Sequence, residues 1–204
     1  PSLLVYQYTA FIPGSANYGK ATPWVKAQRD PSYLFEKAFT FNNSISVSKA
    51  NDVSSFRLSY QNVQGNDILP NTRLDKNSFT GNASYKISDN FTANLFATYV
   101  NQETTGKNPT GYHGFMGNFR QWWATNVDLL DQKNLYFMNK RNNSWNMQGP
   151  DNTAPLYWDN PYFRLYENYV TDARNRFAGN FSLSYDISDK INLLGRVSHD
   201  GFTY

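Results

Sequence analysis

The sequence predicts an all-β protein, an antiparallel transmembrane β-barrel, and three observations support this prediction. First, apolar and polar residues alternate over stretches of about ten residues, which places one set of side chains on each face of a strand. Second, one hairpin motif occurs twice: residues 84–90 read SYKISDN and residues 184–190 read SYDISDK. Third, short turns and long connections alternate along the chain, as in outer-membrane barrels. Strands of about ten residues are long enough to cross a bilayer at a tilt.

The N-terminal segment gives the weakest pattern. Residues 3–12 (LLVYQYTAFI) are predicted to form a strand, because most of their side chains are apolar or aromatic. Residues 13–31 contain three proline breaks and are predicted to form a loop. Residues 33–38 are expected to make one short helical turn before the regular alternation begins.

The first hairpin follows directly. Residues 39–49 alternate between apolar and polar side chains, residues 50–53 form a tight turn, and residues 54–63 alternate again. Residues 64–75 contain a glycine, a proline and several asparagines, and this composition predicts a longer loop. The loops that flank these two strands are therefore expected at the end of the hairpin opposite its tight turn.

The repeated hairpin motif gives four more strands and a prediction of which side chains share a face. The Ser-Asp pairs at 88–89 and 188–189 are typical of turns, because short polar side chains bond their own backbone. One face is apolar and is expected to meet lipid; it carries Phe79, Ala83, Tyr85, Ile87, Leu95, Phe181, Leu183, Leu193 and Val197. The other face is polar and is expected to meet the barrel lumen or a plug; it carries Ser84, Lys86, Asn94, Ser184, Asp186 and Arg196.

Composition limits the function classes. The chain of 204 residues has 17% aromatic and 17% charged residues and a net charge of +3, with its basic residues scattered. Nucleic-acid binding is therefore not indicated. Without cysteine there is no disulfide or thiolate metal site. Six or seven strands are fewer than the roughly eight that a single-chain membrane barrel requires. We therefore expect residues 1–204 to be part of one larger barrel domain, whose other strands lie outside this chain.

Residues 103–174 interrupt the strand pattern and are predicted to form a long extracellular loop. This interval holds four of the five tryptophans, and a run of apolar residues at nearly helical spacing predicts a short helix near 118–134. Aromatic side chains beside carboxamides can stack on sugar rings or bind peptide, but they can also pack as the core of the loop. The candidate contact residues for substrate or partner are Trp122, Trp123, Trp145, Tyr157, Trp158, Asp159, Asn160 and Tyr162.

Catalytic, metal and cofactor chemistry is not indicated. The two histidines, His113 and His199, are far apart and lack the spacing of metal ligands. No Gly-x-Ser-x-Gly elbow is present. Asp128 and Asp131 lie close together on the predicted loop helix, where a capping or solvated role is expected rather than catalysis.

The chain resembles the SusC/RagA-type, TonB-linked outer-membrane transporters from about Trp24 onward. The most specific stretches are YWDNPY at residues 157–162 and YEN at residues 166–168. Lys49-Ala50 departs from the Gly-Gly often found at that turn, which predicts that Asn51 adopts a positive φ. Further resemblance lies in residues 39–60, 68–71, 77–99, 118–128 and 174–176.

The resemblance implies a barrel of about 22 strands closed by a plug domain, in the outer membrane of a Gram-negative cell. It also implies a SusD-like surface lipoprotein as partner, and energy delivered by the TonB complex. The substrates would be oligosaccharides or peptides. The plug domain and the TonB-contacting segment are not expected within this sequence. Two alternatives stay open: a passive outer-membrane porin, and a soluble secreted β-sandwich that binds carbohydrate.

Overall fold

A computed structural model describes residues 2–108, 111–112 and 114–204. Its internal contacts divide the chain into two compact units. The sheet unit contains Phe39–Asn66, Arg73–Thr104 and Thr171–Tyr204. The loop unit contains Pro1–Ala38, Asp67–Thr72 and Thr105–Val170. Each unit is therefore assembled from three separate stretches of sequence.

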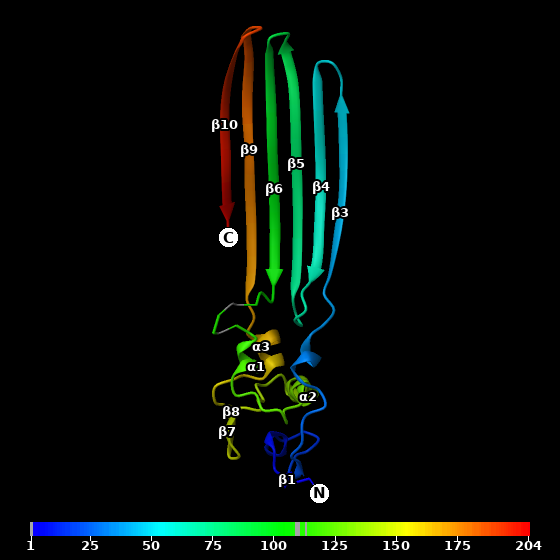
Figure 1. Ribbon diagram of the computed structural model, residues 1–204, viewed down its shortest axis with the longest axis vertical. Helices are drawn as coiled ribbons and strands as arrows, with labels where there is room; N and C mark the ends of the chain where they lie inside the picture. The colour runs from blue at the N-terminus through cyan, green and yellow to red at the C-terminus, as the bar shows by residue number, and fades with distance from the viewer. Residues whose placement is uncertain (1, 109–110, 113) are drawn as a thin grey trace. The chain divides into compact units, whose positions relative to one another are not determined.

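The sheet unit is one six-stranded sheet whose neighbouring strands run antiparallel (Figure 1). This confirms the predicted all-β, antiparallel fold. The spatial order is β10-β9-β6-β5-β4-β3, and no pairing between the edge strands β3 and β10 is found in the described residues. The strands are β3 (Phe39–Ala50), β4 (Ser54–Asn66), β5 (Arg73–Ser88), β6 (Phe91–Thr105), β9 (Thr171–Ser188) and β10 (Ile191–Thr203).

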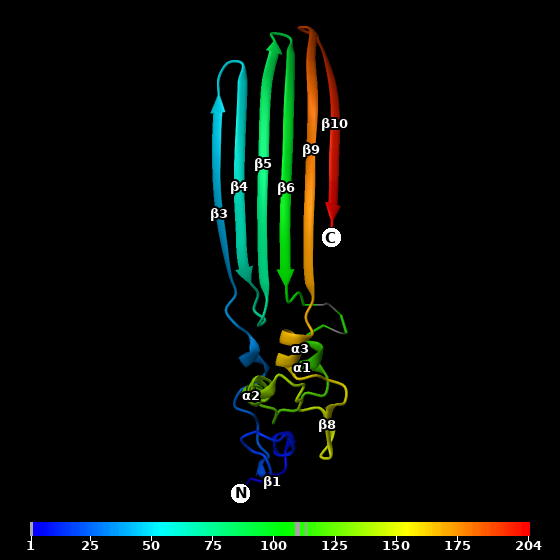
Figure 2. The ribbon, with the colours of Figure 1, turned by 180° about the vertical axis from the view of Figure 1, so that it is seen from behind.

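The three hairpin turns lie at the same end of the sheet (Figures 1 and 2). All three occur where the sequence predicts them, between β3 and β4, β5 and β6, and β9 and β10. The predicted positive φ at Asn51 is wrong. The Asn51 side chain instead accepts hydrogen bonds from the backbone N–H groups of Val53 (3.0 Å) and Ser54 (2.7 Å). A side-chain turn of this kind closes the hairpin without a left-handed residue.

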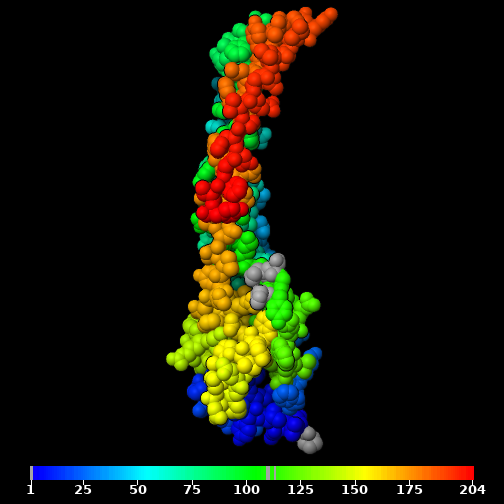
Figure 3. Space-filling model, turned by 90° about the vertical axis from the view of Figure 1, so that its left-hand side faces the viewer, coloured from blue at the N-terminus to red at the C-terminus, as the bar shows by residue number. Residues whose placement is uncertain are grey.

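The register confirms the predicted division into two faces. Residues that face each other in an antiparallel pair lie on the same side of the sheet. Tyr60 pairs with Phe79, Phe181 with Val197, and Tyr185 with Leu193, so apolar side chains meet apolar side chains. Figure 3 views the sheet from its β10 edge and shows a single thin layer. Large apolar side chains on it are exposed, including Phe79 at 53% and Leu58 at 59%.

The loop unit is built from short elements around buried side chains. The predicted strand over residues 3–12 is wrong, because only Leu4–Val5 forms a strand and Tyr8–Phe11 forms a 3-10 helix. Tyr8, Thr9 and Ala10 are all buried, so burial does not alternate as it would along a strand with one covered face. The elements are β1 (Leu4–Val5), η1 (Tyr8–Phe11), β2 (Thr22–Pro23), η2 (Pro31–Leu34), α1 (Gly117–Arg120), α2 (Leu129–Asn139), β7 (Met147–Gly149), β8 (Asn152–Pro155) and α3 (Pro161–Glu167).

The region in which the sequence predicts one helix, residues 118–134, contains parts of two. α1 ends at Arg120, because Gln121 is extended and Trp122 has a φ of 61°. α2 begins at Leu129, where the Asp128 side chain accepts a hydrogen bond from the Leu130 N–H at 2.9 Å. Asp128 therefore has the capping role that the sequence predicts. No helix in the described part of the chain has the length and apolar character needed to cross a membrane.

Candidate functional site

The loop unit has two hydrophobic clusters, and these decide which candidate residues are available to a ligand. The larger cluster contains Leu34, Leu69, Phe115, Leu129, Tyr136, Tyr162 and Leu165. The smaller cluster contains Tyr8, Ile12, Val127 and Leu135. Residues from the N-terminal segment therefore complete the core of an interval that begins a hundred residues later in the sequence.

Asn160 and Tyr162 are structural members of the unit. Asn160 is fully buried and caps α3, because its side-chain oxygen accepts a hydrogen bond from the Tyr162 N–H at 2.9 Å. Its amide group donates to the backbone oxygens of Gln132 (2.8 Å) and Asn143 (2.9 Å). The Tyr162 ring lies in the larger cluster. One asparagine thus joins the start of α3 to α2 and to the loop before β7.

Trp158 and Asp159 precede this cap and are also engaged within the unit. Trp158 is only 8% exposed, and its backbone oxygen accepts a hydrogen bond from the Ser144 hydroxyl at 2.6 Å. The Asp159 carboxylate accepts one from the Asn142 amide at 2.7 Å. The YWDNPY motif that carries the family resemblance therefore contains four buried residues and one half-buried carboxylate.

Trp123 and Trp145 connect the two clusters. Trp123 packs against both of them, and its ring lies edge-on to Trp145 with centroids 4.5 Å apart. The Trp145 indole N–H donates to the Trp122 backbone oxygen at 3.2 Å. Edge-to-face geometry of this kind is favourable for aromatic rings. These two side chains are half-buried, so they offer only part of their surface.

Trp122 and Tyr157 form the exposed part of the candidate site, and we call them the aromatic pair. Their rings are stacked, with centroids 6.0 Å apart and an interplanar angle of 23°. Trp122 is 70% exposed and Tyr157 is 68% exposed. Trp122 has a positive φ, a conformation that bulky residues rarely adopt. Such strained conformations persist only where the surrounding structure holds them, and they cluster at functional sites.

Three polar residues that the sequence did not single out position the aromatic pair and its neighbours. The Asn146 side-chain oxygen accepts hydrogen bonds from the backbone N–H groups of Tyr157 (2.9 Å) and Trp158 (3.1 Å). The Ser144 hydroxyl donates to the Trp158 backbone oxygen, and the Asn142 amide donates to the Asp159 carboxylate. The asparagine-rich stretch at 142–146 was the available signal, since such side chains readily bond nearby backbone.

Burial perturbs two titratable groups near the start of α2. The pKa of Tyr8 is raised by burial and then by the neighbouring Asp131 carboxylate. The pKa of Asp131 is raised by burial and by the Asp128 carboxylate. Asp128 is paired with Arg29 at 3.6 Å. This cluster joins the N-terminal segment to α2, and no ligand is needed to explain it.

The exposed rings of the aromatic pair offer a surface on which a ligand or partner could bind. No group of three or more potential metal ligands occurs among the residues with described positions. His113 lies outside the described residues. A stacked tryptophan and tyrosine present flat apolar rings, which suit a sugar ring, a peptide side chain or a protein partner.

No protein-family model matches this chain. No curated protein matches it either.

Proposed function

We propose that this chain is a segment of a TonB-dependent outer-membrane transporter of the SusC/RagA type. In this proposal the sheet unit is part of the membrane-spanning wall of a larger barrel. The loop unit lies outside the cell and contacts the substrate, an oligosaccharide or peptide, or a SusD-like surface lipoprotein. The observation that carries the membrane part is the apolar face of the sheet and the polar row that borders it.

The border is a row of asparagines. Asn43, Asn62 and Asn77 lie opposite one another on β3, β4 and β5, and the Asn62 amide donates to Asn77 at 2.9 Å. Asn101 donates to Asn175 at 3.0 Å across β6 and β9. An asparagine row is a favourable end to an apolar face, because its amides can bond to water and to lipid headgroups.

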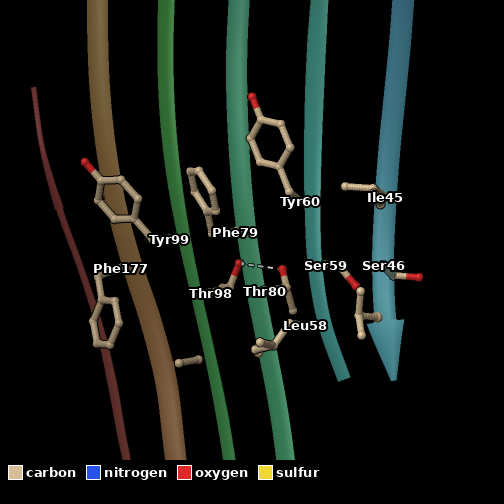
Figure 4. A pocket seen from close by; sticks show the side chains of 13 residues that line it. Ile45, Ser46, Leu58, Ser59, Tyr60, Phe79, Thr80, Thr98, Tyr99 and Phe177 are labelled. Carbon is tan, nitrogen blue, oxygen red and sulfur yellow. Dashed lines mark hydrogen bonds between the residues drawn. The ribbon is translucent and has the colours of Figure 1, made fainter. Parts of the chain in front are cut away.

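Tyrosines lie at the border itself. The Tyr60 hydroxyl donates to Asn77 at 2.7 Å, and the Tyr99 hydroxyl donates to Asn175 at 2.9 Å. Figure 4 shows Tyr60, Phe79, Tyr99 and Phe177 close together around a shallow cavity of about 480 Å³ on this face. Membrane barrels have aromatic girdles at the membrane–water interfaces, where the ring meets lipid and the hydroxyl meets water.

The height of the apolar face agrees with a bilayer. From Phe79 to Ile87 on β5 the face extends over eight residue steps, roughly 27 Å of strand at about 3.3 Å per residue. From Phe177 to Ile187 on β9 it extends over ten steps, roughly 33 Å. At a tilt of about 40° these lengths correspond to a band of roughly 20–25 Å, close to the 25 Å of known membrane barrels.

The soluble-sandwich alternative is less favoured by the sheet topology. A sandwich requires a second large sheet to cover the apolar face. Apart from the six-stranded sheet, the described residues form only two sheets, each of two strands no longer than four residues. A passive porin would have the same barrel wall, but it would lack the plug and the coupling to an energy source.

The first experiment tests sidedness in the full-length native protein. Single cysteines at Asp89, in the β5–β6 turn, and Asn152, in the loop unit, should differ in labelling by a membrane-impermeant maleimide on whole cells. We expect labelling at position 152 only, since short turns of such barrels face the periplasm. Equal labelling, or labelling only at position 89, would contradict the topology.

The second experiment separates a transporter from a porin. Full-length protein extracted from outer membranes should bind the purified periplasmic domain of TonB and should co-purify with a surface lipoprotein. A porin would do neither. Recovery of the full-length protein in the soluble fraction would contradict both membrane functions.

A further inference from the structure

The polar face of the sheet contains a small cavity that is lined by charged residues. The cavity has a volume of about 130 Å³ and is lined by Lys76, Val100, Gln102, Arg174 and Arg176. These residues come from three neighbouring strands, β5, β6 and β9. The site therefore belongs to the rigid sheet and not to a loop.

Two of the three positively charged side chains, Arg174 and Arg176, are held in place by different interactions. Arg176 donates two hydrogen bonds to the Asp200 carboxylate, at 2.8 and 2.5 Å. Arg174 lies over aromatic rings instead: its guanidinium carbon is 4.8 Å from the Phe202 ring centre and 5.5 Å from that of Tyr204. Stacking fixes the plane of a guanidinium group without using its N–H donors.

The donors of the cavity exceed its acceptors. The Arg174 Nε is buried and has no hydrogen-bond partner within the described structure. In the same part of the chain no carboxylate pairs with Lys76. The lining carries three positive side chains, of which Arg176 is paired with the Asp200 carboxylate. Lysine and arginine have no acceptor atoms, and Gln102 can turn its amide group to donate as well.

We propose that this cavity binds one oxyanion group, a carboxylate, sulfate or phosphate, of a ligand that contacts the polar face. Arginine presents paired N–H groups that match the oxygens of such groups, and the resulting charge-assisted hydrogen bonds are among the strongest in proteins. Pockets for whole drug-sized ligands measure about 300–1,000 Å³, so this cavity has room for a single group. The assignment of that group to a transported substrate rests on the proposed function, whereas the binding of an oxyanion does not.

The test uses inorganic sulfate as the probe and the full-length native protein in detergent. Titration calorimetry at low ionic strength should detect sulfate binding. Lys76→Gln and Arg174→Gln should each weaken it about tenfold, because each removes a charged donor. Lys86→Gln is the matched control, since Lys86 lies on the same face outside the cavity, and it should bind as wild type does. Lys76→Arg should retain binding.

Two results would overturn the inference: no sulfate binding by the wild type, or equal binding by wild type, Lys76→Gln and Arg174→Gln. Competition with sulfate then identifies the source of the oxyanion group. Trigalacturonate tests sugar carboxylates. A pentapeptide with a free C-terminus tests peptide carboxylates, and the same pentapeptide with an amidated C-terminus is its control. Displacement of sulfate by either supports the assignment to a ligand, and displacement by neither contradicts it. If the full-length protein is soluble yet binds sulfate through Lys76 and Arg174, the transport proposal fails while this inference stands.

Discussion

The loop unit has a core that includes buried aromatic side chains, whereas no aromatic side chain is buried among the described residues of the sheet unit. Phe115 in the loop unit is 2% exposed and Tyr136 is 1% exposed. In the sheet unit Phe79 is 53% exposed and Tyr85 is 54% exposed. Side chains of the same kinds thus serve two different purposes. The loop unit has an internal core of the kind that folds in water, while the sheet is a single layer that needs an apolar medium or partner to cover it.

The largest difference should appear when a buried tryptophan is compared with an exposed one. Trp158→Ala should destabilise the loop unit by about 3–5 kcal/mol, the usual result of truncating a large buried aromatic side chain. Trp122→Ala should change stability by less than about 0.5 kcal/mol, because the ring is mostly in water. Urea unfolding of the full-length protein measures both changes in stability, with limited proteolysis used to detect unfolding of the loop unit.

Variants of the two exposed rings, Trp122→Ala and Tyr157→Ala, test the proposed function of the aromatic pair. Trp122→Ala should assemble normally in the membrane and weaken substrate uptake or lipoprotein binding. If Trp122→Ala and Tyr157→Ala both assemble and function as wild type does, the aromatic pair is not a contact site.

The next prediction concerns the medium around the sheet. Leu95→Arg should destabilise the folded sheet in a bilayer by about 2–4 kcal/mol, because the charged side chain would lie in the hydrocarbon near the midplane and lose its hydration. Asn94→Arg, one residue away on the polar face, is the control and should fold nearly as wild type does. Folding into lipid vesicles, read from heat-dependent gel mobility, distinguishes them. A larger defect in Asn94→Arg would reverse our assignment of the two faces.

A smaller effect is expected at the buried asparagine of the loop unit. Asn160→Ala removes the cap of α3 and should lower the free energy of unfolding by about 0.5–2 kcal/mol. A further loss of stability is expected because the backbone oxygens of Gln132 and Asn143 lose their donor. Asn152→Ala, at an exposed position, provides the comparison. Thermal unfolding monitored by tryptophan fluorescence is the measurement, and identical melting curves for the two variants would contradict the role of Asn160.

The smallest effect concerns the pH dependence of the loop unit. The pKa of Asp131 is raised above its ordinary value of 3.8, so the folded state favours the protonated carboxyl. Its contribution to stability is therefore greatest below about pH 4 and is lost as the pH rises through the raised pKa. Asp131→Asn should raise the melting temperature near neutral pH, and Asp151→Asn, at an exposed position, should not. A lower melting temperature for Asp131→Asn at neutral pH would show that the carboxylate stabilises the unit.

Local patterns predicted the sheet well because strand pairing repeats a simple period. The six strands, the three tight turns and the two faces follow from alternation and turn residues. The ends of the strands were less accurate: β5 begins at Arg73, inside the predicted loop, because polar residues at 73–77 continue the ladder of backbone hydrogen bonds. Backbone pairing does not require an apolar side chain, so hydropathy does not reveal it.

The candidate site was only partly predictable. The sequence selected the segments 122–123 and 157–162, because aromatic residues cluster there. It could not distinguish Trp122 from Trp158, which are 70% and 8% exposed. Burial in a compact loop unit depends on contacts between distant segments, and no local pattern encodes them.

By itself, the sequence determined the antiparallel strands, their turns and the apolar and polar faces, because each depends on residues near one another in the chain. Only the tertiary structure showed that Tyr8, Ile12 and Leu34 complete the core of the loop unit and that Asn160 joins α3 to α2. It alone brought Lys76, Arg174 and Arg176 to one cavity from strands a hundred residues apart. The physical reason is the same in each case: these contacts form between segments that chain folding brings together, and their spacing in the sequence carries no repeating signal.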